Sequence, residues 1–409
     1  MGKKTLWQVF SAMPHRMFFA LGTVLLVLPM LWWTHYLYER YFGELYQLSH
    51  PPIHAHVMLM VYGALSQFVL GFALTVFPRW LSTQDIRPIS FKVLFLLNLA
   101  GFLIYSAGLW LGGWIPAIGS GLVYLSFSTA TIILLKVLLN SQHPDKTQVW
   151  YTWVAFASAS AGTLFFTVYL VLDEAVYYRL ATGIGVYFFL PLLVLSIAYR
   201  MVPFFTSVVL EGYQVRRVKW VLRLWLLACL LKTILFVLGL KEFYFVSELG
   251  LLTGCLVQFY YWDFFRKKKV WLLKYLYISL AWLPISSLLF ALFSLDAFFT
   301  GIQSYPLELA STHALLVGCI SSLVFGMATR VSLGHSGRPL TTGKFEDLLF
   351  LLLQLTAFIR VGGELLRIYD PLWESYIGLS GVLWLVCFIV WGIKYFPIYF
   401  LPRIDGNPG

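Results

Sequence analysis

The chain has 409 residues, of which 60% are hydrophobic and only 11% are charged. A soluble protein carries roughly 25% charged residues, so this composition excludes a soluble domain of any size. The formal net charge of +11 could indicate nucleic-acid binding, but the Lys and Arg residues lie in short clusters between apolar runs, which is typical of loops at a membrane surface.

Apolar runs of about 20 residues, the length that spans a bilayer, repeat along the whole sequence. The runs are continuous rather than alternating, and they therefore predict helices, which satisfy their own backbone hydrogen bonds in lipid. In chain order, the predicted spans lie at roughly 17–37, 55–77, 93–110, 117–139, 150–171, 181–199, 220–240, 244–262, 275–293, 307–329, 347–368 and 376–400. We predict an all-α, polytopic bundle of about twelve membrane helices that forms one integral membrane domain over residues 1–409.

Basic residues give this bundle an orientation. Most clusters of Lys and Arg fall on one side of a twelve-span chain, and the other side carries few: Arg40, Arg179, Lys241 and Arg367. The positive-inside rule therefore places both termini in the cytoplasm. The sequence predicts a multi-pass protein whose first partner is the lipid bilayer.

Three histidines open two of the predicted spans. His54 and His56 follow Pro51 and Pro52 at the start of the second span, and His313 lies in the first two turns of the tenth. Both spans begin on the non-cytoplasmic side, so the three lie about 5–10 Å inside that face. If the two spans are neighbours, the imidazoles could converge on a haem iron or a copper ion. An equally good interpretation is that each histidine only hydrogen-bonds a neighbouring helix.

The spacing of these histidines restricts what they can share. His54 and His56 are two residues apart, and on a continuous helix they point to nearly opposite sides. Both could serve one site only if the helix begins irregularly, which Pro52 permits. His335 lies roughly 33 Å farther along a continuous helix than His313, so the two cannot share a site. In the segment Ser332–Pro339, His335 could bind a second metal or an anion, or it could cap a tight turn.

Buried charges add a further candidate. Arg360 and Glu364 lie one turn apart in the non-cytoplasmic half of the eleventh span and can pair. Arg360 could equally hold an anionic group of a cofactor, such as a haem propionate. Lys232 and Glu248, in the seventh and eighth spans, would also suit a secondary transporter.

At these same positions the sequence resembles the NnrS family. Three segments carry the resemblance, in the same order and with similar spacing: HAHVML at His54–Leu59 with GFALTVFPRW at Gly71–Trp80, RMVPFFT at Arg200–Thr206, and HALLVGCISSLVFGMATRVSLGHSGRPL at His313–Leu340. Residue by residue, His54, His56, His313, His335 and Arg200 match family positions. The chain departs from the family at Val57, Arg79 and Tyr199, where the family has Glu, Asn and Gly.

The resemblance implies a twelve-helix protein of the bacterial cytoplasmic membrane, distantly similar to the catalytic subunit of haem–copper oxidases. It also implies a b-type haem, copper as a second metal, and a role in the nitric oxide response and the relief of nitrosative stress. Val57 removes a carboxylate beside the expected site and puts any proton-transfer role there in doubt. The oxidase-type copper motif, with its His-x-x-x-Tyr and His-His pattern, is absent.

The sequence therefore predicts a haem-binding membrane protein that acts on nitric oxide or iron–nitrosyl species. The expected metal ligands are His54, His56, His313 and His335, and the expected cofactor-binding residues are His54, His56, His313 and Arg360. A reductase-like activity, sensing and simple binding all stay open, as does the electron donor. The alternatives are a secondary transporter and a haem- or metal-handling assembly factor.

Overall fold

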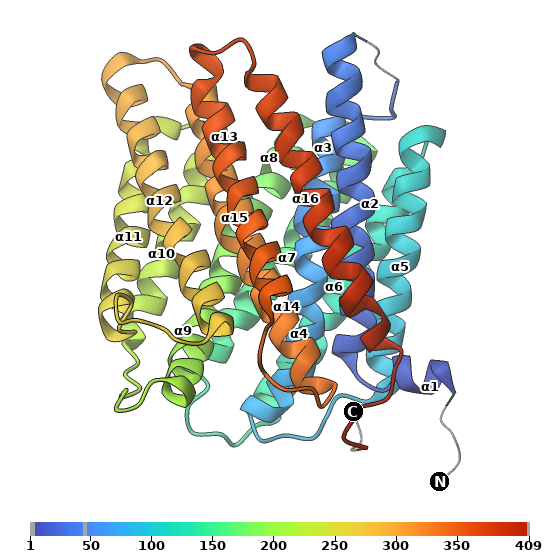
Figure 1. Ribbon diagram of the computed structural model, residues 1–409. Coiled ribbons are helices and arrows are strands. Elements are labelled where there is room, and N and C mark those ends of the chain that lie inside the picture. Colours follow the sequence, from blue (N-terminus) through green and yellow to red (C-terminus); the bar gives the residue numbers. More distant parts are fainter. Residues whose placement is uncertain (1–4, 44–46, 407–409) are drawn as a thin grey trace.

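Twelve long helices form a single bundle (Figure 1). The structure is a computed structural model that describes residues 5–43 and 47–406, and these residues contain helices and loops but no strand. All twelve helices are long and apolar enough to cross a membrane. This confirms the predicted all-α class and the predicted number of spans.

We number the membrane-spanning helices as spans 1–12 in chain order. A short helix, α1 (Leu6–Phe10), precedes them. The spans are α2 (Pro14–Phe42), α3–η1–α4 (Pro52–Trp80), α5 (Pro88–Leu111), α6 (Ile115–Asn140), α7 (Thr147–Leu172), α8–η2–α9 (Ala175–Val209), α10 (Lys219–Leu238), η3–α11 (Lys241–Tyr261), α12 (Trp271–Thr300), α13–η4–α14 (Tyr305–His335), α15 (Lys344–Leu365) and α16–η6 (Trp373–Tyr399). Most extend a few residues beyond the predicted limits because a helix continues past the apolar stretch that lies in lipid.

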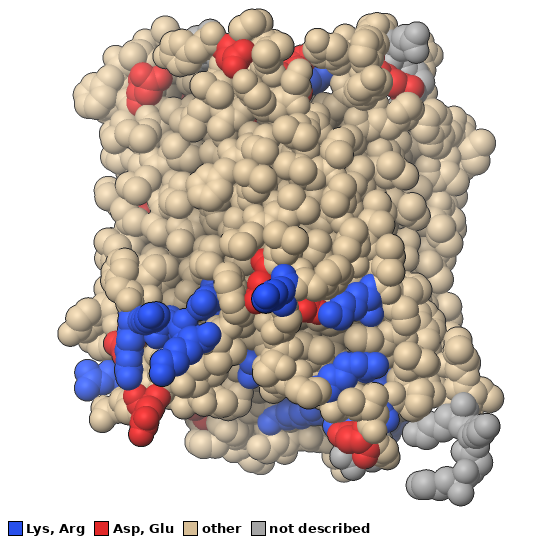
Figure 2. Space-filling view, in the orientation of Figure 1, with Lys and Arg blue, Asp and Glu red and all other residues tan. Residues whose placement is uncertain are grey.

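Both termini lie at the same end of the bundle (Figure 1). On the face drawn in Figure 2, Lys and Arg gather in the half of the molecule nearest that end. The charged residues visible at the far end are mainly Asp and Glu. We call the end with the termini the basic end. This is the distribution that the positive-inside rule predicts for a bundle with its termini in the cytoplasm.

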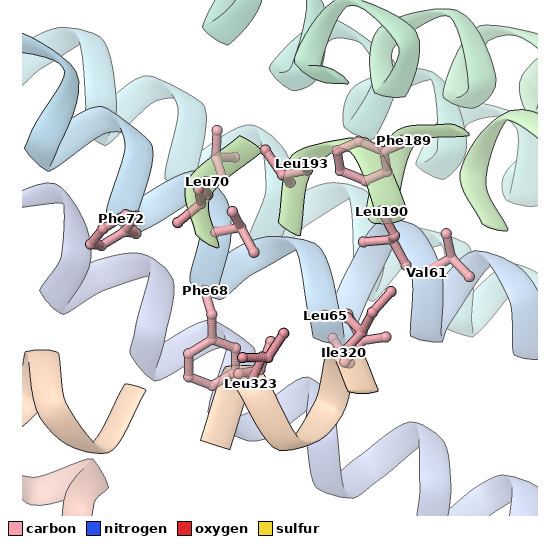
Figure 3. Close-up of a cluster of buried hydrophobic side chains, with 14 of the residues drawn as sticks. Val61, Leu65, Phe68, Leu70, Phe72, Phe189, Leu190, Leu193, Ile320 and Leu323 are labelled. Carbon is pink, nitrogen blue, oxygen red and sulfur yellow. The ribbon is translucent and has the colours of Figure 1, made fainter. Parts of the chain in front are cut away.

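Spans 2, 6 and 10 form the centre of the bundle. In their most apolar windows 89%, 78% and 72% of the residues are buried, whereas no other span exceeds 61%. Their side chains meet in one apolar cluster (Figure 3), in which Val61 and Leu65 of span 2 lie near Leu190 of span 6 and Ile320 of span 10. Most residues in the middle of these three spans are therefore surrounded by protein rather than by lipid.

The same three spans contain the π-helical segments found in the described residues. They are η1 (Met58–Ala64), η2 (Ile184–Phe189) and η4 (Ala314–Ser321). Such segments widen the helix locally and are frequent at functional sites. Two of them begin directly after the histidine-bearing turns, because η1 follows α3 (Pro52–Val57) and η4 follows α13 (Tyr305–His313).

Candidate functional site

A cavity of about 680 Å³ lies between spans 1, 2, 6, 10, 11 and 12, and the facing ends of spans 7 and 8 also line it. It lies toward the end opposite the termini, where α3 and α13 begin (Figure 1). Both His56 and His313 line it, and so does Arg360. The same three residues line a smaller apolar cavity that extends toward the middle of the bundle. We call the larger space the histidine cavity. Spans 2 and 10 are thus neighbours here, as the convergence of their histidines requires.

His56 lines the histidine cavity and has one unpartnered ring nitrogen. Its ring stacks on Trp33 of span 1, with centroids 4.2 Å apart and an interplanar angle of 21°. Its Nδ1 is buried and has no hydrogen-bond partner among the described residues. A buried polar atom without a partner costs free energy, so its presence beside a cavity points to a ligand that would satisfy the ring.

His313 is oriented by its own helix. Its Nδ1 lies 2.8 Å from the carbonyl oxygen of Leu309. A carbonyl only accepts, so the proton lies on Nδ1 and the lone pair of Nε2 is free. Metal-binding histidines are held in this way, with one ring nitrogen donating to a backbone carbonyl and the other facing the metal.

His54 points elsewhere. Its Nδ1 lies 2.8 Å from the hydroxyl of Tyr169, and its ring stacks on Tyr178 with centroids 3.5 Å apart. It does not line the histidine cavity. The irregular helix start that would bring both histidines to one site is not present, because α3 is regular and the π-helical segment begins only at Met58. Of the two neighbouring histidines, the structure brings only His56 together with His313.

Arg360 forms an ion pair within its own helix and also lines the histidine cavity. Its Nη1 lies 2.7 Å from Glu364, which is the predicted pair one turn apart. The guanidinium also lines the histidine cavity. Arg367 lies 3.8 Å from the second oxygen of the same carboxylate and lines the cavity as well. One buried carboxylate therefore holds two arginines at the wall.

Two further basic residues, Arg40 and Lys241, lie at the site, although the sequence did not predict them there. Together with Arg360 and Arg367 they form what we call the basic rim. Arg40 and Lys241 both line the histidine cavity, where Lys241 lies 2.8 Å from Glu308 and Arg40 lies 3.3 Å from Glu374. The lining holds four cations against two carboxylates, Glu308 and Glu364, which leaves a net charge of +2. A signal for this existed in the sequence. Three of the four basic residues that break the positive-inside pattern converge on this one cavity.

Val57 also lines the histidine cavity. The carboxylate that the NnrS pattern carries at this position would lie in the cavity wall next to His56. With valine there, the wall beside His56 is apolar. The lining carboxylates are Glu308 and Glu364, both already engaged in ion pairs.

His335 lies at the other end of span 10 from His313. It is the last residue of α14 (Ser322–His335), and its ring lies 4.2 Å, centroid to centroid, from that of His15 in span 1. Nδ1 of His15 is buried without a partner. The two ends of span 10 thus belong to separate clusters. Among the described residues, no group of three or more His, Cys, Asp or Glu side chains is arranged to hold a metal ion.

Lys232 and Glu248, the buried charges that would suit a transporter, neutralise each other. They form an ion pair between α10 (Lys219–Leu238) and α11 (Tyr244–Tyr261), with both side chains at most 3% exposed. The ammonium lies 3.0 Å from the centroid of the Phe290 ring. Neither residue lines the histidine cavity.

Comparison with known proteins gives two findings. A family model described as "NnrS protein" matches residues 9–403. Among solved structures, the chain is similar to one described as "Cryo-EM structure of a heme-copper terminal oxidase dimer provides insights into its catalytic mechanism", with a TM-score of 0.68 and 12% sequence identity over 98% of this chain and 86% of that one. That similarity shows the fold and confirms the predicted oxidase-like architecture. A search of the curated proteins found no match.

Proposed function

The chain belongs to the NnrS family, and we propose that it binds a haem in the histidine cavity and acts on nitric oxide at the bacterial cytoplasmic membrane. His56 and His313 would supply nitrogen ligands to the iron. The observation that carries the proposal is that two imidazoles, from spans 2 and 10, line one cavity. Each has a ring nitrogen to which no described residue is hydrogen-bonded.

The cavity fits such a cofactor in charge as well as in donor atoms. A haem carries two carboxylates, and the basic rim places Arg360, Arg367 and Arg40 in the cavity wall. Arginine binds carboxylates through paired donors, and it stays charged when it is partly buried. None of the four cysteines lines the cavity, and all four are buried elsewhere. This supports a haem held without a covalent thioether bond, which is compatible with the b-type haem that the family resemblance implies.

Nitric oxide suits the surroundings of the site. When bound, the haem would supply an iron that can hold a small diatomic molecule in place of one of the two histidines. The smaller cavity that adjoins the histidines is lined mainly by apolar groups such as Met60, Leu65 and Val317. A small apolar molecule can reach such a site through the lipid, so the chain needs no polar channel for it.

The reductase-like activity stays a prediction, and so does the copper. Both lining carboxylates are engaged with cations, and Val57 provides no proton donor beside His56. The resemblance implies a copper ion, and His335 with His15 is a described place where two imidazoles meet. We propose only the haem for the histidine cavity.

The decisive experiment is spectroscopic. The full chain would be produced with an adequate haem supply, purified in detergent and measured for its Soret band and haem content. We expect about one haem per chain, with a loss of roughly tenfold or more in His56→Ala and His313→Ala. His54→Ala and His335→Ala serve as matched controls and should keep the haem. Addition of nitric oxide should shift the Soret band of the unaltered protein.

Two results would overturn this proposal. The first is an unaltered protein that carries no haem, which is what a secondary transporter would give. The second is loss of haem in His335→Ala while His56→Ala and His313→Ala retain it. An assembly factor would instead bind haem and release it readily to an acceptor protein such as apomyoglobin.

A further inference from the structure

A second cavity, unrelated to the histidine cavity, lies at the basic end. It has a volume of about 140 Å³ and is bounded by the loop before α7 (Thr147–Leu172), the end of span 6 and the start of α10. It shares no lining residue with the histidine cavity. Arg200, which matches an NnrS motif position, lines it, and the proposed function gives that residue no role.

Positive charge dominates this cavity. Arg200, Arg217 and Lys219 line it, against the single carboxylate of Asp145, so the lining carries a net charge of +2. Lys219 lies 3.0 Å from Asp145. Neither arginine has a carboxylate within ion-pair distance among the described residues. Arg200, which is half-buried, and Arg217, which is exposed, thus line one small space without forming an ion pair there.

Asp145 is fully occupied by its neighbours. Its Oδ1 accepts a hydrogen bond from the backbone N–H of Thr147 at 3.0 Å, and its Oδ2 pairs with Lys219. Hydrogen bonds from Thr147, followed by Lys219, lower the pKa of Asp145 to about 2. The carboxylate therefore stays ionised at neutral pH and pairs with Lys219, but it forms no ion pair with either arginine.

Two buried polar groups also lack partners in this cavity. Tyr199 is 3% exposed and Gln148 is 6% exposed, and both line the space. The Tyr199 hydroxyl and the Gln148 Oε1 have no hydrogen-bond partner among the described residues. The Tyr199 hydroxyl can donate to an anion. The Gln148 Nε2 already donates to the Thr152 hydroxyl at 2.8 Å, so Gln148 is left with an acceptor and is not one of the proposed anion ligands. Unpaired groups of this kind are costly unless a ligand satisfies them.

The backbone adds to the positive potential. Thr147 is the first residue of α7 and Lys219 is the first residue of α10, and both line the cavity. The N-terminus of a long helix carries a partial positive charge and favours anions. Arg200 also contributes to this potential, and its guanidinium packs on Trp80, 5.0 Å from the centroid of the indole ring.

From this arrangement we propose that the cavity binds one phosphate-type oxyanion, through Arg200, Arg217 and the Tyr199 hydroxyl. Arginine recognises phosphate through paired donors, and a tyrosine hydroxyl adds a neutral one. The space is about a fifth of the volume of the histidine cavity, which suits a single tetrahedral group rather than a whole nucleotide. The phosphate belongs either to inorganic phosphate from the cytoplasm or to the headgroup of an anionic phospholipid. Both sources are available at the basic end of a membrane bundle.

The test measures binding to the purified full chain and needs no haem. One arm titrates delipidated protein with sodium phosphate at constant ionic strength by calorimetry. The other adds phosphatidylglycerol and counts bound lipids by native mass spectrometry. We expect saturable binding at millimolar concentration or below in one arm, which identifies the source. Arg217→Gln should weaken that binding about tenfold, and Tyr199→Phe should weaken it several-fold.

Matched variants separate this site from general surface charge. Arg216→Gln removes the neighbouring arginine, which does not line the cavity, and should leave the affinity unchanged. Asp145→Asn should tighten binding several-fold, a gain that a misfolded protein would not show. The proposal is overturned if neither phosphate nor phosphatidylglycerol binds saturably, or if Arg216→Gln and Arg217→Gln weaken binding equally. Because the readout is anion binding, its failure is distinct from a failure to bind haem.

Discussion

His56 and His313 line one cavity from two membrane spans, although they lie far apart in the sequence. The relationship depends on the rotation of α3, which turns His56 inward and its neighbour His54 toward Tyr169. Two side chains that are two residues apart on a regular helix point to nearly opposite faces of it. Only one histidine of the pair can therefore join His313, and the packing of span 2 selects His56.

Trp33 should act as a positioning residue for His56. Its ring stacks on the imidazole, so Trp33→Leu should let that ring rotate and weaken haem retention several-fold without abolishing it. The measurement is the rate of haem transfer to apomyoglobin together with the position of the Soret band. Trp32→Leu is the control, because Trp32 does not line the histidine cavity. Equal effects of both substitutions would show that Trp33 contributes only bulk.

Glu364 should matter more for stability than Arg360. Glu364→Gln leaves two arginines without their carboxylate, whereas Arg360→Met leaves Glu364 beside Arg367. Removing one partner of a buried pair costs roughly 3–5 kcal/mol, and we expect the glutamate substitution to reach that range and the arginine substitution to fall below it. Unfolding of the haem-free protein in mixed detergent checks this order. The reverse order would mean that Arg367 does not support Glu364.

The Lys232–Glu248 pair should be strongly coupled. Either Lys232→Met or Glu248→Gln leaves one charge buried and unpaired, so each should cost roughly 3–5 kcal/mol of unfolding free energy. The double variant should cost less than the sum of the two. Arg266→Gln breaks a pair with Asp263 whose side chains are both nearly half exposed, and it should cost less than about 1 kcal/mol. Additive effects at Lys232 and Glu248 would contradict this pairing.

Gly119 should be intolerant of even a methyl group. A Cβ added there would lie 2.3 Å from the backbone nitrogen of Tyr105, where α5 and α6 approach closely. The backbone cannot yield as a side chain can, so Gly119→Ala should destabilise the protein by roughly 1–3 kcal/mol. Gly121→Ala lies on the same helix and would make only ordinary contact, at 3.8 Å from Thr167. The melting temperatures of the two variants give the comparison, and similar values would contradict the close approach.

The sequence by itself determined the number of spans, the side of the membrane on which each span ends, and which spans carry histidines. Hydropathy is a local property that sums along each helix, and basic residues sort by side of the membrane regardless of how the helices pack. Those features needed no tertiary contact. The pairing of Arg360 with Glu364 was also predictable, because residues four apart on a helix are neighbours.

Only the tertiary structure decided which side chains meet. Lipid-facing and protein-facing sides of these helices are both apolar, so the sequence carries no stripe that marks the inward face. For that reason the sequence could not predict which of His54 and His56 lines the histidine cavity, or that Arg40 and Lys241 line it beside Arg360. It also could not predict that Tyr199 and Arg217 line one cavity. Each of these contacts depends on the rotation of one span against another that is distant in the chain, and the packing of the bundle fixes that rotation.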